Sequence, residues 1–307
     1  MIRALKNRGV ALITAMLIAA LAAMVAANLA WDNALDVRRT MMLLNRDQAV
    51  QVALGAESWI MNILREDLEA SQTDHLGELW AAQLPPLPID NGEVFGTIED
   101  LQGRFNVNNL LDNEGKIEEE SLEQFRRLLN ALGVDQRFAG ITADWIDSDR
   151  EPSFPDGAED SIYTGMIPSY RTANQALSNV SELAAIEGMD RETFKILEPH
   201  ISALPGRTPV NANTATPAVL LSLDENMTVA DVEGLVTERE ATGFTDIETS
   251  FASLVTPDVL NRLEDSTQYF RLKVVVQIDT VRVTLYSVLL RGPQGSVTPV
   301  LRSLGTT

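Results

Sequence analysis

The chain has 307 residues and no cysteine, with 24 basic and 44 acidic side chains and a formal net charge of −20. A surface this acidic repels nucleic acid and anionic lipid headgroups, and it offers many carboxylates to divalent cations. The absence of cysteine excludes disulfides and thiolate metal sites. The length is sufficient for an anchored domain with a sizeable apolar core.

The first thirty residues combine a short basic segment with a long apolar one. Arg3, Lys6 and Arg8 precede Gly9, and residues 10–30 form an apolar run about long enough to cross a bilayer as a helix. The basic flank predicts that the N-terminus stays in the cytoplasm and that everything after residue 30 lies across the membrane. A plain single-pass signal anchor has the same two features and remains the alternative for this segment.

Helical character continues beyond the apolar run. Residues 31–69 contain no proline and one glycine, Gly55. Their apolar and charged side chains are interleaved in the pattern of an amphipathic helix with one buried stripe. Pro85 and Pro86 then mark a boundary. After it, residues 93–99 and 101–107 predict a pair of strands around a turn.

The clearest β signal lies near the other end of the chain. Residues 269–278 and 281–290 are rich in β-branched side chains and predict a hairpin. The long region between the predicted strands, residues 108–266, reads as mostly helical. The sequence therefore predicts an α+β fold, in which a long N-terminal helix packs on an antiparallel sheet and a large, mainly helical domain is inserted between the strands.

The predicted insert contains an internal repeat. Asn106-Val-Asn108 opens one half and Asn211-Ala-Asn213 opens the other, and each precedes a helical stretch as a cap would. The second half resembles helix-hairpin-helix modules, which supplies an alternative function, a membrane-anchored DNA-binding receptor. Two features oppose it, because residues 223–227 are acidic and lack glycine where a phosphate-binding hairpin needs it, and no basic patch is present. We therefore expect no nucleic-acid partner.

An acidic stretch in the insert is the one place where ligand chemistry is concentrated. Pro152, Pro155 and Gly157 turn the chain so that carboxylates on both sides of them can converge, and calcium prefers such hard oxygen ligands. The spacing is not that of an EF-hand, because Pro152 and Ala158 occupy the sixth and twelfth positions counted from Asp147. A solvated acidic loop is the alternative. The candidate ligands are Asp144, Asp147, Asp149, Glu151, Asp156, Glu159 and Asp160.

No enzyme motif is present in the sequence. The two histidines, His75 and His200, are far apart and lack metal-ligand spacing. Gly-x-Ser-x-Gly, phosphate-loop and His-Glu-x-x-His patterns are also absent. We expect no catalytic residues and no enzyme activity.

The basic leader, Gly9 and the apolar helix together resemble the start of type IV pilins and pseudopilins. That resemblance implies that a prepilin peptidase cuts after Gly9 and methylates the new amino terminus on Val10. Most such subunits carry glutamate as the fifth residue after the cut, whereas this chain has Thr14. The missing glutamate and the order of predicted elements over the whole chain resemble the K-type minor pseudopilins of the type II secretion system.

The K-type resemblance implies an organisation and a role. It implies a tip subunit that initiates the pseudopilus for export of folded proteins across the outer membrane, anchored in the bacterial inner membrane with a periplasmic C-terminal domain. Implied partners are the I-, J- and H-type minor pseudopilins, the prepilin peptidase, and secreted proteins or the outer-membrane secretin; bound calcium is implied for the insert. The implied segments are a leader (1–9), a transmembrane helix (10–30), a first pilin-like part (31–107), the inserted domain (108–266) and C-terminal strands (267–307).

Overall fold

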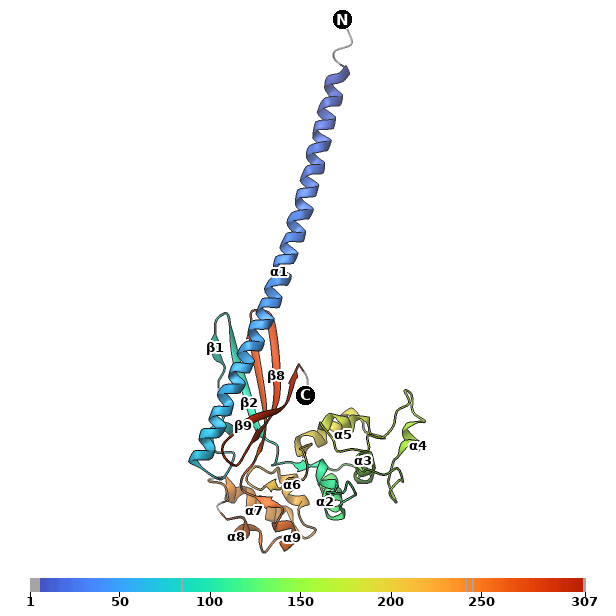
Figure 1. The fold of residues 1–307 in the computed structure, drawn as a ribbon, viewed down its shortest axis with the longest axis vertical. Coiled ribbons are helices and arrows are strands. Elements are labelled where there is room, and N and C mark those ends of the chain that lie inside the picture. The colour runs from blue at the N-terminus through green and yellow to red at the C-terminus, as the bar shows by residue number, and fades with distance from the viewer. Residues whose placement is uncertain (1–5, 84, 241, 245, 306–307) are drawn as a thin grey trace.

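The computed structural model describes residues 6–83, 85–240, 242–244 and 246–305 (Figure 1). A single helix, α1 (Lys6–Ala70), is 65 residues long, and its N-terminal half projects away from every other element. Its C-terminal part packs on a sheet, and a mainly helical head lies beyond the end of the sheet farthest from the N-terminus. The predicted α+β fold with an inserted helical domain is confirmed.

The projecting half of α1 is apolar and uncovered. Leu12, Leu17 and Leu21 are each 60–66 % exposed. The most apolar stretch of the helix is not buried within the molecule. Its length and composition fit a single-pass membrane anchor.

The other half of α1 buries one stripe against the sheet. Ala49, Ala53, Ile60 and Leu64 are buried at spacings of four, seven and four residues, which places them on one face of a helix. They share an apolar core with inward-facing strand residues that include Val274, Val276 and Leu285. The amphipathic pattern of the sequence therefore becomes a helix-on-sheet layer.

The sheet is antiparallel throughout and has the strand order β1-β2-β7-β8-β9. β7 and β8 form the predicted hairpin, which is confirmed. β1 and β9, which the sequence pattern did not single out, occupy the two edges. The strands are β1 (Leu87–Ile89), β2 (Gly92–Asp100), β7 (Tyr269–Ile278), β8 (Val281–Arg291) and β9 (Val297–Leu304).

The predicted pairing of residues 93–99 with residues 101–107 is wrong. β2 pairs instead with β1 and, over its full length, with β7. Residues 101–107 leave the sheet and are almost continuously buried in the head, so no face of this segment is available to alternate with solvent. Only β3 (Phe105–Asn106) forms a strand there, and it pairs in parallel with β4 (Ile201–Ser202).

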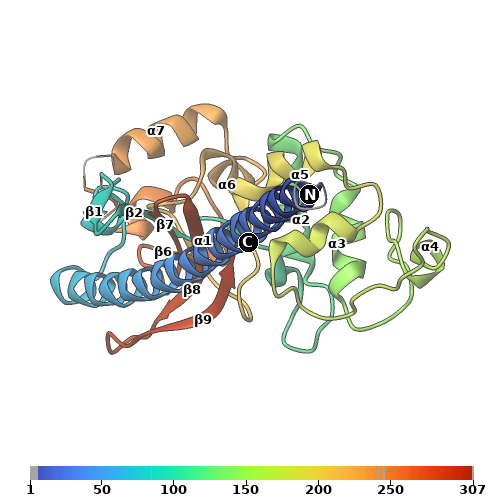
Figure 2. The same cartoon turned by 90° about the horizontal axis from the view of Figure 1, so that it is seen from above.

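The head consists of short elements between β2 and β7, spread below and beside the sheet (Figures 1 and 2). A further 3₁₀ helix, η1 (Leu79–Ala81), lies between α1 and β1. The head's helical elements are η2 (Val107–Leu110), α2 (Glu119–Ala131), α3 (Phe138–Ile146), α4 (Asp160–Tyr163), η3 (Val180–Ala185), α5 (Arg191–Leu197), η4 (Glu198–His200), α6 (Pro217–Ser222), α7 (Val229–Arg239), α8 (Ile247–Phe251) and α9 (Pro257–Leu260).

The internal repeat is visible at the opening of each half of the head. β3 pairs with β4, and β5 (Val210–Asn211) pairs with β6 (Leu263–Glu264), both in parallel. In each half the side-chain oxygen of the first asparagine accepts a hydrogen bond from the backbone N–H of the second, at 3.2 Å in the first half and 3.0 Å in the second. The cap prediction holds only for Asn106, which caps η2, because Thr216 caps α6 in the second half.

The head and the helix-on-sheet layer have separate apolar cores. Polar groups join them at the point where the chain leaves the sheet. Asp100, at the end of β2, accepts hydrogen bonds from Asn211 Nδ2 at 2.8 Å and from Thr214 Oγ1 in the head. The junction between the two parts therefore contains buried polar contacts beside a small apolar cluster of Leu101, Leu204 and Tyr269.

Candidate functional site

The acidic stretch predicted to bind a cation begins at the end of α3. Asp147 is the C-cap of this helix, and its N–H bonds to the carbonyl of Ala143 at 2.9 Å. An irregular loop follows and ends at Glu159, the N-cap of α4. Asp147 and Glu159 therefore stand at the two ends of one loop.

Asp144 and Gly157 fold that loop back onto α3. The carboxylate of Asp144, fully buried, accepts the N–H of Ser153 at 3.0 Å. A Cβ on Gly157 would lie 2.2 Å from Asp144 Oδ2 and 2.3 Å from the backbone nitrogen of Ser153. Only glycine fits at this close approach of the chain to itself.

Three of the seven predicted ligands come together in the loop. Asp147, Asp149 and Glu159 each offer one oxygen, and these oxygens lie within 4.8 Å of one another. Asp147 and Glu159 are buried, whereas Asp149 is exposed. Among the described residues, Asp147 Oδ1 and Glu159 Oε1 have no hydrogen-bond partner. Buried oxygens without donors suit a cation that would coordinate them.

The three carboxylates repel one another. Burial, together with the charges of Asp149, Asp144 and Glu159, raises the pKa of Asp147 from 3.8 to about 7. Burial also raises the pKa of Glu159, although its hydrogen bond from Thr172 opposes this shift. In the described part of the chain no ion pair reaches any of the three, so only a proton or a cation would relieve the repulsion.

The other four predicted ligands have different positions. Asp144 lies under the loop, where burial raises its pKa, and contributes charge rather than an oxygen to the group. Asp156 faces Arg126 at 3.8 Å, and Asp160 accepts the N–H of Thr172 at 3.2 Å. Glu151 is exposed.

Asn174 is a residue that the sequence pattern did not identify. Its side-chain oxygen is buried and has no partner within the described residues, and its side-chain nitrogen donates to the backbone carbonyl of Asp149. Its backbone has a positive φ of 45°, which asparagine tolerates better than most residues. A single asparagine about 25 residues from Asp149 carries no local signal that would have marked it.

The N-terminal features lie on the projecting part of α1. Residues 1–5 of the predicted leader are outside the described residues, while Gly9 and Val10 lie within the helix. The hydroxyl of Thr14 donates within its own helix, with the carbonyls of Val10 and Ala11 as acceptors at 3.1 and 3.0 Å. Thr14 therefore offers a neighbour no charge.

In the region that resembles a DNA-binding hairpin, an aspartate of the chain itself accepts the hydrogen bonds of backbone N–H groups. Asp224, between α6 and α7, accepts hydrogen bonds from the N–H of Asn226 at 3.0 Å and the N–H of Thr256 at 3.3 Å. These backbone donors are directed at a carboxylate of the chain itself. These N–H groups are therefore not free to bind a phosphate, and the carboxylate of Asp224 would repel one.

Comparison with known proteins decides the family. Two family models match, both described as type II secretion system, protein K, over residues 103–206 and 210–264. The type II secretion system protein K of Pseudomonas aeruginosa is 35 % identical over 97 % of this chain and 93 % of its own length. The chain belongs to the type II secretion system protein K family. The Aeromonas hydrophila protein K is 30 % identical over 98 % of both chains.

A solved structure supports the same family and fold. The chain is similar, with a TM-score of 0.77 and 25 % identity, to a chain of the GspK-GspI-GspJ complex from enterotoxigenic Escherichia coli. The match covers 88 % of this chain and all of that one. The chain is therefore a minor pseudopilin of type II secretion, and the members of its family are structural components of the secretion system.

Proposed function

We propose that this protein stands at the tip of the pseudopilus and initiates its assembly, so that folded proteins can be exported across the outer membrane. The observation that carries this proposal is the position of the head. It lies beyond the end of the sheet farthest from the N-terminus and extends to the side of the α1 axis (Figures 1 and 2). A further subunit added at the head end of the molecule would meet the head, whereas subunits added toward the N-terminal end can pack along α1.

Thr14 supports the same position. A glutamate at this place in an apolar helix is costly unless a neighbour supplies a positive charge. Thr14 satisfies its hydroxyl within its own helix and needs no such neighbour. A subunit with nothing above it has no use for the glutamate.

The proposed partners are other minor pseudopilins. The structurally similar protein is part of a complex with GspI and GspJ. We assign I- and J-type subunits as direct partners of this chain, with an H-type subunit below them, and the secretin or a secreted protein as the contact of the head. The exposed small residues of the anchor, which include Ala15, Ala19 and Ala22, allow close helix packing in the membrane.

The anchor is proposed to have its N-terminus in the cytoplasm and its sheet and head in the periplasm. A prepilin peptidase would remove residues 1–9 and methylate Val10. Intact mass of protein from membranes tests this, with and without a co-expressed peptidase. Only when the peptidase is present do we expect the mass to decrease by that of Met1–Gly9 and to increase by that of one methyl group. An uncut chain beside an active peptidase would contradict the pseudopilin mode of insertion.

The head is proposed to hold structural calcium between Asp147, Asp149 and Glu159, with Asn174 beside them. The buried oxygens without donors support this, because calcium takes six to eight oxygen ligands from carboxylates, amides and backbone. The ion would fix the loop between α3 and α4. No step of chemistry is assigned to it, and we expect no catalytic turnover.

Calorimetric titration of the full-length protein in detergent tests the calcium proposal. Asp147→Asn with Glu159→Gln should remove the binding that this loop provides. Glu151→Gln is the matched control, because its carboxylate is exposed and outside the group of three. Equal binding by the double variant and the control would rule out this set of ligands.

A further inference from the structure

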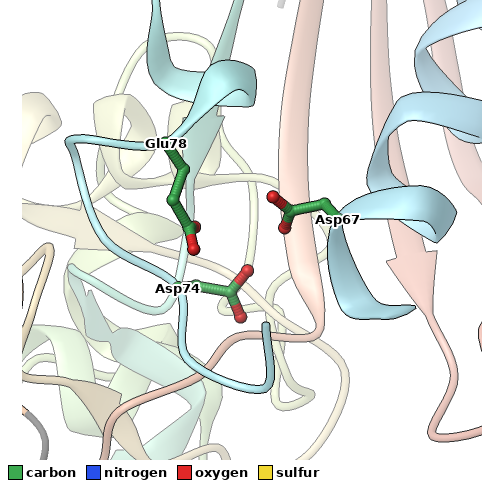
Figure 3. A group of neighbouring side chains, drawn as sticks. All are labelled: Asp67, Asp74 and Glu78. Atoms are coloured by element: carbon green, nitrogen blue, oxygen red, sulfur yellow. The ribbon is translucent and has the colours of Figure 1, made fainter. Parts of the chain in front are cut away.

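A second set of carboxylates lies at the junction of α1, which forms the stem of the molecule, with the sheet and the head (Figure 3). Asp67 is in the last turn of α1, Asp74 is in the loop that follows, and Glu78 precedes η1. One oxygen from each lies within 4.8 Å of the others. Figure 3 shows the carboxylates of Asp67 and Glu78 directed toward the carboxylate of Asp74.

Donors of the protein already hold one oxygen of Asp74 and one of Glu78. Asp74 Oδ2 accepts the N–H of Thr267 at 2.7 Å and a guanidinium N–H of Arg291. Glu78 Oε2 accepts the indole N–H of Trp80 at 2.7 Å and the backbone N–H of His75 at 3.1 Å. These bonds fix both carboxylates in place and leave a second oxygen on each.

The second oxygen of Asp74 is the decisive feature. Asp74 is 1 % exposed, and among the described residues its Oδ1 has no hydrogen-bond partner. A buried acceptor without a partner costs about 1–3 kcal/mol, and more for a charged group. Asp74 is a member of the group of three carboxylates, and a ligand held by that group could satisfy this oxygen.

The charges at the junction are unbalanced. Three carboxylates face one buried guanidinium, that of Arg291, which reaches Asp67 Oδ2 at 3.2 Å and also pairs with Asp74. Asp100 adds a fourth negative group, which acts on Asp74 from the head side. His75 Nε2 lies 3.8 Å from Glu78 Oε1 and adds positive charge only when protonated. A divalent cation would neutralise the excess of the three carboxylates over Arg291.

We propose that Asp67, Asp74 and Glu78 bind a hard divalent cation of the calcium type at the base of the head. This site is separate from the loop between α3 and α4 and does not depend on that loop binding calcium. Oxygen-only ligands favour calcium or magnesium over transition metals.

The cation would join elements that belong to different parts of the molecule. Asp67 belongs to the stem helix, whereas the loop of Asp74 is bonded to the head. The N–H of Asp74 donates to the carbonyl of Asp265 at 2.8 Å, and Asn211 Nδ2 donates to the carbonyl of Asp74 at 3.0 Å. Cation binding therefore holds the orientation of the head on the stem.

Terbium luminescence of the full-length protein in detergent tests the site. Tb³⁺ can occupy calcium sites. The indole of Trp80, which is hydrogen-bonded to Glu78, can sensitise the emission of a Tb³⁺ ion bound there. The loop site is first silenced with Asp147→Asn and Glu159→Gln, since Trp145 is near it. In this background we expect tryptophan-sensitised emission that calcium displaces. Absence of that emission would overturn the proposal.

Variants at the junction then assign the emission. Asp74→Asn and Glu78→Gln should each abolish it, whereas Glu69→Gln, an exposed change in the same turn of α1, should preserve it. Emission that survives Glu78→Gln would overturn the assignment. If Asp74→Asn fails to fold, hydrogen exchange tests the site instead. It is measured on the protein with the silenced loop site (the parent) and on the same protein carrying Glu78→Gln. Calcium should slow exchange around residues 67–80 only in the parent, and equal protection in both would also overturn the proposal.

Discussion

The helix-on-sheet layer and the head each have an apolar core, but they satisfy their buried polar groups by different means. In the layer, α1 covers the sheet with an apolar stripe. An ion pair links the last strand to α1, because the half-exposed Arg302 donates from two nitrogens to the buried carboxylate of Glu57. In the head, buried asparagines join short elements that also share an apolar core. Asn108 donates to the carbonyls of Leu177 and Leu204, both at 2.9 Å, and accepts the N–H of Leu177 at 2.8 Å.

This difference shows how a loop-rich insert satisfies its buried backbone groups where its strands are too short to pair them. Repeated backbone pairing satisfies the polar groups of the sheet. In the head, the described strands β3 to β6 are each two residues long. Side chains such as that of Asn108 therefore satisfy backbone groups that lie 69 and 96 residues away along the chain. The head should therefore be more sensitive to loss of one polar side chain than the layer is.

The largest effect is expected for Asn108→Ala. The change leaves two buried carbonyls and one N–H without partners, and each such group costs about 1–3 kcal/mol. We expect the free energy of unfolding to fall by about 4 kcal/mol in urea denaturation. Asn130→Ala is the control, because Asn130 is exposed on α2 and should change stability by less than about 0.5 kcal/mol. Equal effects of the two variants would contradict the role assigned to the buried asparagine.

A smaller effect is expected for Arg302→Met in the layer. Glu57, 1 % exposed, would lose its guanidinium partner and keep the hydroxyl of Ser287. Breaking a buried pair costs about 3–5 kcal/mol, and because Arg302 is half exposed we expect about 2 kcal/mol. Arg282→Met on exposed β8 surface is the matched control. The comparison fails if this variant is as destabilising as Asn108→Ala.

The two acidic groups predict a pH dependence in protein stripped of divalent cations. The pKa values of Asp147 and Asp74 are each raised from 3.8 to about 7, chiefly by burial. Between these values the folded state binds more protons than the unfolded state, so the free energy of unfolding should fall as pH rises from about 4 to about 7.

Thermal unfolding at a series of pH values measures this trend. Asp147→Asn should reduce the slope, and Asp74→Asn should reduce it further. Saturating calcium should reverse it, because a cation binds the ionised carboxylates. A stability that rises with pH in chelator would show that these carboxylates are not strained when charged.

The smallest effect is expected at the far end of the molecule. Thr14→Val removes a hydroxyl that only bonds its own helix, so export of a folded substrate should be unchanged. Comparison of exported and retained substrate in cells measures this. Loss of export in the valine variant would show that Thr14 contacts a neighbouring subunit.

The sequence pattern predicts the layer better than the head. The hairpin of β7 and β8 and the amphipathic part of α1 follow from periods of two and 3.6 residues. Residues 101–107 mislead the same reasoning, because they are buried on all sides in the head and β7 provides the partner that β2 needs. Periodicity has no information about a segment without a solvent face.

The candidate cation ligands are partly predictable for a related reason. Asp147, Asp149 and Glu159 lie close in the sequence, so their density marks the loop. Asn174 reaches the same loop from a distant segment, and Asp67, Asp74 and Glu78 are brought together only by the turn after α1. Tertiary folding rather than local spacing assembles these parts.

Labelling of assembled pseudopili tests the central claim most directly. Gold-conjugated antibody against an epitope tag at the C-terminus of the full-length protein would be imaged on pseudopili sheared from cells. A tip subunit predicts a single label at one end of each filament. Labels distributed along the filament length would contradict the tip position, whatever the family of the chain.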